Sequence, residues 1–197
     1  MKKIIVAFVF VFVSAVVQGQ EVRFGLKGGT NVSLFGNKVD PKLGFQLGLF
    51  SKIKLADQWY VQPEALYLEQ SVKRDNFSVG LFTFDRATMK LSSIYVPVVF
   101  RYYPLNDLFL ESGPQVGFLV KTKATAEYQG NSGEIDVDDE FKKVDFGFNF
   151  GTGYDISERF SLNIRYYVGL TKMSDSDYVR DFYNRNSILS LSGAFTF

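Results

Sequence analysis

Bulky apolar residues recur at every second position along much of this chain, and this period constrains the fold more than any other feature. In KVDFGFNFGTGYD (143–155), Phe146, Phe148 and Phe150 alternate with small or polar residues. A period of two is typical of a β-strand whose two faces meet different surroundings. Eight such segments occur, over 22–31, 42–53, 58–71, 88–103, 107–122, 142–154, 159–171 and 187–197. The sequence therefore predicts an all-β chain with essentially no helix after its first residues.

The connections between these segments alternate in length. Those after the second, fourth and sixth segments are short: KLADQ, YPLND and DISER. The others are longer and polar, such as VKRDNFSVGLFTFDRA, ATAEYQGNSGEIDVDDE and SDSDYVRDFYNRN. This alternation places all long loops at one end of an up-and-down antiparallel sheet. Aromatic residues in those loops are candidates for contact with a partner; they are Phe77, Phe82, Phe84, Tyr128, Tyr178, Phe182 and Tyr183.

The composition of the two strand faces predicts which face is inside. The less bulky face consists mainly of Gly, Ser, Asn, Gln and Thr, whereas a strand surface in water would be dense in charged residues. Small side chains suit the crowded interior of a narrow barrel, and a continuous apolar outer band is tolerated only in lipid. We therefore predict an eight-stranded antiparallel up-and-down transmembrane β-barrel. A soluble lipocalin-like barrel, with its bulky face inward, alternates in the same way and is the alternative.

Aromatic residues gather at the short-loop ends of the segments. This arrangement resembles the ring of aromatic side chains that lies at a membrane interface. The set is Trp59, Tyr60, Tyr102, Tyr103, Phe109, Tyr154, Phe160 and Phe197.

The N-terminus has the features of an export signal. Lys2 and Lys3 precede IIVAFVFVFVSAVV, an apolar run shorter than the roughly 20 residues that a membrane-spanning helix needs. Val17 and Gly19 supply the small residues of a cleavage site. We expect a cleaved signal peptide over 1–19, a mature chain that starts near Gln20, and a barrel domain over 20–197. A retained N-terminal anchor is the alternative.

The composition argues against several classes of function. The chain has no cysteine and no histidine, so disulfides, thiolate metal sites and the commonest general base are absent. Its formal charge of +1 gives no reason to expect nucleic-acid binding. The GTG at 151–153 lacks the strand–turn–helix context of a dinucleotide loop. The acidic stretches EIDVDDE (134–140) and DSDYVRD (175–181) lack the spacing of a calcium loop. We predict no enzyme, no cofactor and no metal.

Strand parity places a set of charged residues on the inner face. Buried charges must be paired or solvated, so the set is expected to form an internal network of ion pairs that fills the barrel. In particular, Arg101 is expected to pair with Glu64 or Glu111. The alternative is a selectivity ring in a narrow pore. The set is Arg23, Lys27, Glu64, Arg101, Glu111, Asp145 and Arg165.

A family resemblance spans nearly the whole chain after residue 20. Its motifs, in order, are RFGLKGGTN, YVQPEALYLEQ, SSIYVPVVFRYYP, LESGPQVGFLV, DFGFNFGTGYDI and LNIRYYVGLTKM. Together they resemble the outer-membrane β-barrel domain of the PorT type, common in Bacteroidetes-like bacteria and similar in architecture to OmpA and OmpX. The resemblance implies eight strands, short periplasmic turns and an aromatic C-terminus. The terminal GAFTF resembles the signal that barrel-insertion machinery reads. The founding member is linked to a secretion and gliding apparatus.

These observations predict a monomeric outer-membrane protein of a Gram-negative cell. Its expected role is structural or interactive, with outer-membrane lipid around the barrel and a protein or surface polymer at the long extracellular loops. No nucleic acid is expected among the partners. The alternatives are a narrow channel, a lipid-handling barrel, and a soluble periplasmic carrier.

Overall fold

The computed structural model describes residues 21–34, 40–79, 82–128, 131–136, 142–172 and 185–197. Its strands are β1 (Val22–Ser33), β2 (Asp40–Ala56), β3 (Trp59–Val79), β4 (Phe82–Tyr102), β5 (Leu108–Tyr128), β6 (Asn131–Asp136), β7 (Val144–Asp155), β8 (Phe160–Lys172) and β9 (Arg185–Thr196). In these residues no helix is long and apolar enough to cross a membrane.

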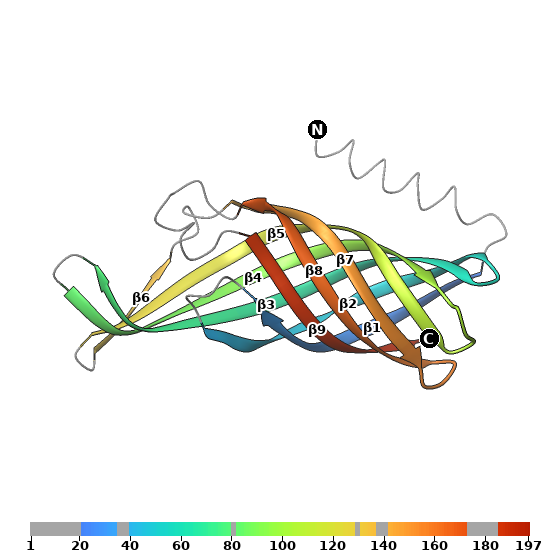
Figure 1. Ribbon diagram of the computed structural model, residues 1–197, viewed down its shortest axis with the longest axis horizontal. Coiled ribbons are helices and arrows are strands. Elements are labelled where there is room, and N and C mark those ends of the chain that lie inside the picture. Colours follow the sequence, from blue (N-terminus) through green and yellow to red (C-terminus); the bar gives the residue numbers. More distant parts are fainter. Residues whose placement is uncertain (1–20, 35–39, 80–81, 129–130, 137–141, 173–184) are drawn as a thin grey trace.

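Eight of the strands close into an antiparallel barrel (Figure 1). Each barrel strand pairs with its neighbours in the order β1-β2-β3-β4-β5-β7-β8-β9, and β9 returns to pair with β1 over Gly25↔Thr196 to Ser33↔Ile188. Short turns join β2 to β3, β4 to β5 and β7 to β8 at one end. The predicted all-β, eight-stranded, up-and-down barrel is confirmed.

The sheet continues beyond the barrel at the end opposite the short turns. Strands β3 and β4 stay paired as far as Val79↔Phe82, and β6 pairs only with the outer part of β5, from Lys123↔Asp136 to Tyr128↔Asn131. Figure 1 shows this extension of β3, β4, β5 and β6 projecting from the barrel. We call it the strand extension.

The strand extension corrects the prediction of long loops after the third and fifth segments. Phe77 pairs with Phe84, Phe82 begins β4, and Tyr128 ends β5, so these residues belong to strands. The apolar alternation is a pattern of side chains, whereas backbone pairing does not require it, so the strands extend beyond the segments that the alternation marks. Tyr178, Phe182 and Tyr183 lie outside the described residues.

The bulky face points outward, as the strand composition predicts. In β7, the exposed fractions of Phe146, Phe148 and Phe150 are 40%, 39% and 52%, against 7% for Asp145 and 0% for Asn149. The same contrast holds around the barrel, where large apolar residues of every barrel strand are exposed. This orientation is the inverse of a soluble barrel, and it leaves an apolar outer band of the kind that only lipid tolerates.

Inward-facing rings lie against glycines of the neighbouring strand. Phe50 is directly opposite Gly25, and Phe109 is directly opposite Gly153. A Cβ atom on Gly25 would come within 2.3 Å of the Phe50 ring, and one on Gly153 within 2.2 Å of the Phe109 ring. The glycines therefore provide the space in which the rings fill a narrow lumen.

Only part of the predicted aromatic ring lies on the outer surface. Trp59, Tyr154, Phe160 and Phe197 are exposed, and the Tyr102 ring lies 4.8 Å from that of Trp59. The other three predicted members turn inward instead: Tyr103 and Phe109 are buried, and the Tyr60 ring packs edge-on against that of Tyr103. For Tyr60 and Phe109 the reason is parity, because they share their strand faces with Glu64 and Glu111.

Candidate functional site

Arg165 on β8 is the centre of a buried network of charges that crosses the lumen. Its Nε donates a hydrogen bond to Glu111 Oε1 at 2.6 Å. Its two terminal nitrogens donate to the two oxygens of Glu64, each at 2.8 Å. This forked contact is the geometry in which a guanidinium binds a carboxylate most strongly. Arg165 thereby joins β3, β5 and β8 through the middle of the barrel.

Two further cations complete the network. Lys27 on β1 lies with Nζ 3.3 Å from Glu64 Oε1, and Arg101 on β4 lies with Nε 2.9 Å from Glu111 Oε2. The Arg101 guanidinium also lies 4.1 Å from the centre of the Phe109 ring. We call the five side chains the lumen network; they are Lys27, Glu64, Arg101, Glu111 and Arg165, and all are at most 5% exposed.

Neutral amides add a further hydrogen bond to one oxygen of each carboxylate. Gln62 donates to Glu64 Oε1 and Asn163 donates to Glu111 Oε1, each at 2.8 Å. With three cations and two carboxylates, the lumen network carries one excess positive charge when all its groups are ionised. Charges this deeply buried are tolerable because nearly every one is both paired and hydrogen-bonded.

Two residues of the predicted interior set are not part of the lumen network. Arg23 is half exposed at the short-turn end of the lumen, where it pairs with Glu21. Asp145 is buried but lies on β7 six positions from Gly151, the residue that pairs with both Glu111 and Arg165. Six residues of strand span about 20 Å, so Asp145 is too far along the barrel to join the lumen network. Parity predicts the face of a side chain but not its level along the barrel axis.

Asp145 belongs to a second buried group, nearer the strand extension. Asn186 donates to Tyr95 Oη at 2.6 Å and to Asp145 Oδ2 at 3.3 Å. Gln70 donates to Asn186 Oδ1 at 3.1 Å and to Ser33 Oγ at 2.7 Å. These contacts link β1, β3, β4, β7 and β9, so the lumen is bridged at two levels.

The space left between the two levels is small. A cavity of about 10 Å³ lies there, and its lining includes Gln46, Gln115 and Arg165. A volume of roughly 10–15 Å³, by the same measure, is needed to hold one water molecule. The middle of the barrel is therefore filled by side chains, with room for about one water.

The short-turn end of the lumen holds a polar cavity of about 440 Å³, which we call the mouth. Lys52 lies over the rings of Tyr60 and Tyr103, with Nζ 4.8 Å from each ring centre. It donates to Tyr103 Oη at 2.7 Å, and Tyr103 donates to Asp155 Oδ2 at 3.0 Å. Burial raises the pKa of Tyr103 above its ordinary value, so its hydroxyl remains a donor near neutral pH.

Sequence reasoning missed the mouth. Lys52 shares its strand face with Gln46 and Phe50, so parity alone would place its side chain inside. Its nearness to Tyr103 and Asp155, by contrast, depends on how three short turns meet, and no local pattern reports that.

The described residues contain no group of three or more histidine, cysteine or acidic side chains that could hold a metal ion. The two acidic stretches that the sequence analysis weighed as cation sites lie partly or wholly outside the described ranges. The interior charges are instead arranged to bind one another.

Comparison with known proteins identifies relatives of this barrel. The profile of a family described as outer membrane protein β-barrel domain matches residues 18–175. Ail, the attachment invasion locus protein of Yersinia pestis, is similar in structure with a TM-score of 0.50 and 14% identity, over 92% of this chain and 100% of that one. Neisserial surface protein A gives a TM-score of 0.51 and 14% identity, over 91% and 100%. At this identity the likeness concerns the fold. No curated protein sequence matches the chain.

Proposed function

Because this chain belongs to the outer membrane protein β-barrel domain family, we propose that it is an outer-membrane barrel with a closed lumen and a structural or interaction role. The role is neither transport nor catalysis. Outer-membrane lipid surrounds the apolar band, and the chain acts as a monomer without a nucleic-acid partner.

The observation that carries the proposal is the lumen network. Lys27, Glu64, Arg101, Glu111 and Arg165 come from five different strands and form direct ion pairs across the barrel. A water-filled pore would leave these charges hydrated, whereas here they are almost fully buried. An eight-stranded barrel is narrow enough for side chains to fill it completely.

The strand extension is the surface that we propose contacts a partner. Its strands include Phe77, Phe82, Phe84 and Tyr128. A backbone that is already paired loses little conformational freedom on binding, which favours recognition of a protein or a surface polymer. Tyr178, Phe182 and Tyr183 belong to the same proposed contact set.

The route to the membrane is also part of the proposal. Residues 1–19 act as a cleaved signal peptide, and the C-terminal GAFTF is read by the barrel-insertion machinery. The short turns face the periplasm and the strand extension faces outward. The PorT-type motifs motivate assignment to that branch of the family, and a link to a secretion apparatus is a hypothesis that follows from it.

Conductance measurement tests the closed lumen. Wild-type protein in a planar lipid bilayer should give no steady ion current. A triple variant that replaces Lys27, Glu64 and Arg165 with serine should conduct, because it removes the centre of the lumen network. A control variant that replaces the exposed pair Lys54 and Asp57 with serine should stay silent; the pair lies 3.4 Å apart at the short-turn end. Steady current through the wild type would contradict the closed lumen and favour a narrow channel.

Two alternatives predict different results. A lipid-handling barrel should retain bound lipid after purification. That lipid should exchange with labelled lipid added to the bilayer. A soluble periplasmic carrier should stay monodisperse without detergent, yet Leu43, Leu47 and Leu49 on β2 are 71%, 60% and 59% exposed on the outer face. Such a band is expected to aggregate in water.

A further inference from the structure

The mouth at the short-turn end is a built polar cavity that the proposed role does not use. Three adjoining hollows share Lys52 and Glu158, and the largest has a volume of about 440 Å³. Sites for small molecules typically measure about 300–1,000 Å³. The mouth is therefore large enough to hold a ligand of a few residues.

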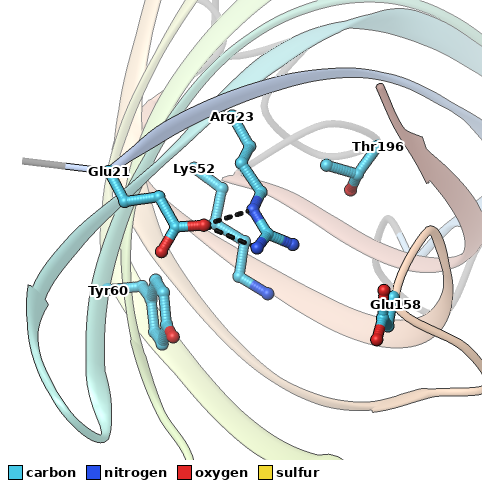
Figure 2. A pocket seen from close by; sticks show the side chains of 6 residues that line it. All are labelled: Glu21, Arg23, Lys52, Tyr60, Glu158 and Thr196. Carbon is cyan, nitrogen blue, oxygen red and sulfur yellow. Dashed lines mark hydrogen bonds and ion pairs between the residues drawn. The ribbon is translucent and has the colours of Figure 1, made fainter.

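Three cations lie at the floor of the mouth, and each has a carboxylate partner: Arg23 pairs with Glu21, Lys52 with Asp155 and Arg101 with Glu111. Arg23 and Lys52 are directly paired across β1 and β2, and Figure 2 shows both with Glu158 across the opening. Arg101 lines the smallest of the three hollows and is only 2% exposed. Its Nη2 has no hydrogen-bond partner among the described residues. A buried donor without an acceptor is costly, so an anionic oxygen at the floor would satisfy it.

The rim of the mouth is acidic. Asp57, Asp107 and Glu158 lie on the three short turns, one on each, and all line the largest hollow. Between floor and rim, the wall includes the rings of Tyr60 and Tyr103. The mouth thus has cations and Asp155 at its floor, further carboxylates at its rim and aromatic surface between them.

We propose that the mouth binds a short peptide that carries both a free carboxylate and an ammonium group. The carboxylate lies against the unpartnered nitrogen of Arg101 and accepts a hydrogen bond from the remaining N–H of Lys52, which also binds Tyr103 and Asp155. The ammonium group lies among the rim carboxylates, and the intervening chain packs on Tyr60 and Tyr103. Charge-assisted hydrogen bonds at both ends fix the direction of the peptide.

Two kinds of periplasmic peptide have this chemistry. That the mouth faces the periplasm rests on the orientation given in the proposed function. One is the stem peptide of the cell wall, whose diamino acid supplies the ammonium group. The other is the C-terminal tail of a periplasmic protein. Both present a free carboxylate at the end of an extended chain, so the same cavity suits either.

Titration calorimetry on wild-type barrel in lipid nanodiscs tests the proposal. The probes are the stem tripeptide L-Ala-γ-D-Glu-diaminopimelate, the linear peptide Ala-Ala-Lys, and both peptides with their carboxylates amidated. At least one free-acid probe should bind. Its amide should bind at least about tenfold more weakly, because a charge-assisted hydrogen bond is lost. Binding of the stem tripeptide alone, or of the linear peptide alone, identifies the source. Absence of binding by either free acid at millimolar concentration would overturn the proposal, as would equal binding of acid and amide.

Variants locate the binding in the mouth. Lys52→Met should weaken binding about tenfold, and Glu158→Gln, on an exposed turn where folding is not at stake, about threefold. Lys42→Met is the matched control, since Lys42 is an exposed lysine at the other end of the same strand and does not line the mouth, and it should leave binding unchanged. Unchanged affinity in both Lys52→Met and Glu158→Gln would place the peptide elsewhere and refute the site.

The same preparations separate this inference from the proposed function. No peptide binding combined with a silent lumen would overturn the mouth site and leave the closed barrel intact. Peptide binding combined with steady current would support the mouth site and overturn the closed barrel.

Discussion

Replacing Glu111 with glutamine removes one of the two negative charges of the lumen network and keeps the shape of the side chain. Glu111 accepts hydrogen bonds from Arg165 at 2.6 Å, Asn163 at 2.8 Å and Arg101 at 2.9 Å. After the replacement, Arg165 still has both oxygens of Glu64 as partners. Arg101 loses its carboxylate partner, and its guanidinium keeps the contact with the Phe109 ring.

The expected loss of stability follows from that asymmetry. Removing one partner of a buried ion pair costs about 3–5 kcal/mol, because an uncompensated charge is left behind. The network starts with one excess positive charge, and Glu111→Gln raises the excess to two. We therefore expect a loss near 4 kcal/mol, a large fraction of the roughly 5–15 kcal/mol by which a typical domain is stable. Removing Arg101 at the same time, as Arg101→Met, should restore much of it.

Urea unfolding in phospholipid vesicles measures these changes as a double-mutant cycle. The coupling between Arg101 and Glu111 should be at least about 2 kcal/mol, within the range found for contacting residues. Glu158→Gln makes the same chemical change on an exposed turn and should cost less than about 0.5 kcal/mol. The reasoning is refuted if Glu111→Gln stays within about 1 kcal/mol of the wild type, or if the two single effects add.

Three other predictions concern the lipid face, the glycines and the N-terminus. Phe148→Arg should prevent stable insertion, since a charge at mid-bilayer costs about 2–4 kcal/mol on a barrel's lipid face, whereas Ser161→Asn on the inner face should fold in the same vesicle assay. Gly25→Ala should lose about 1–3 kcal/mol in urea unfolding, because its methyl would lie 2.3 Å from an inward ring, while Gly28→Ala, with its nearest neighbour at 3.5 Å, should be neutral; equal losses would dismiss the packing argument. N-terminal sequencing of membrane-extracted protein should begin near Gln20, and a sequence that begins at residue 1 would contradict signal cleavage.

The faces of the barrel strands were predictable because two unlike media enforce the period of two. Phe148 must face lipid and Asn149 the lumen, so the residue types at neighbouring positions indicate which way each side chain points. The same logic placed Lys27, Glu64, Arg101, Glu111 and Arg165 inside, where they lie. It did not place Asp145 or Arg23 at the right level along the axis, because level depends on strand stagger around the closed barrel.

Other features had no local signal. The strand extension continues beyond the segments that the sequence predicted, and in it Phe77 pairs with Phe84. The mouth forms where turns distant in sequence converge, so Lys52 meets Tyr103 and Asp155 only in the closed barrel. The inward position of Phe109, by contrast, could have been read from its parity with Glu111.

Accessibility scanning along β7 tests the central claim most directly, namely that the bulky face meets lipid and the polar face fills the lumen. The chain has no cysteine, so single cysteines can be introduced over 145–150 and labelled with nitroxides without background. In vesicles, oxygen from the bilayer should relax the labels at Phe146, Phe148 and Phe150, whose side chains are 39–52% exposed. Labels at Asp145 and Asn149, which are 7% and 0% exposed, should be shielded from it. The account would be contradicted if oxygen relaxed the labels at positions 145 and 149 and not those at 146, 148 and 150. Strong access of a water-soluble relaxing agent at every position would contradict it too.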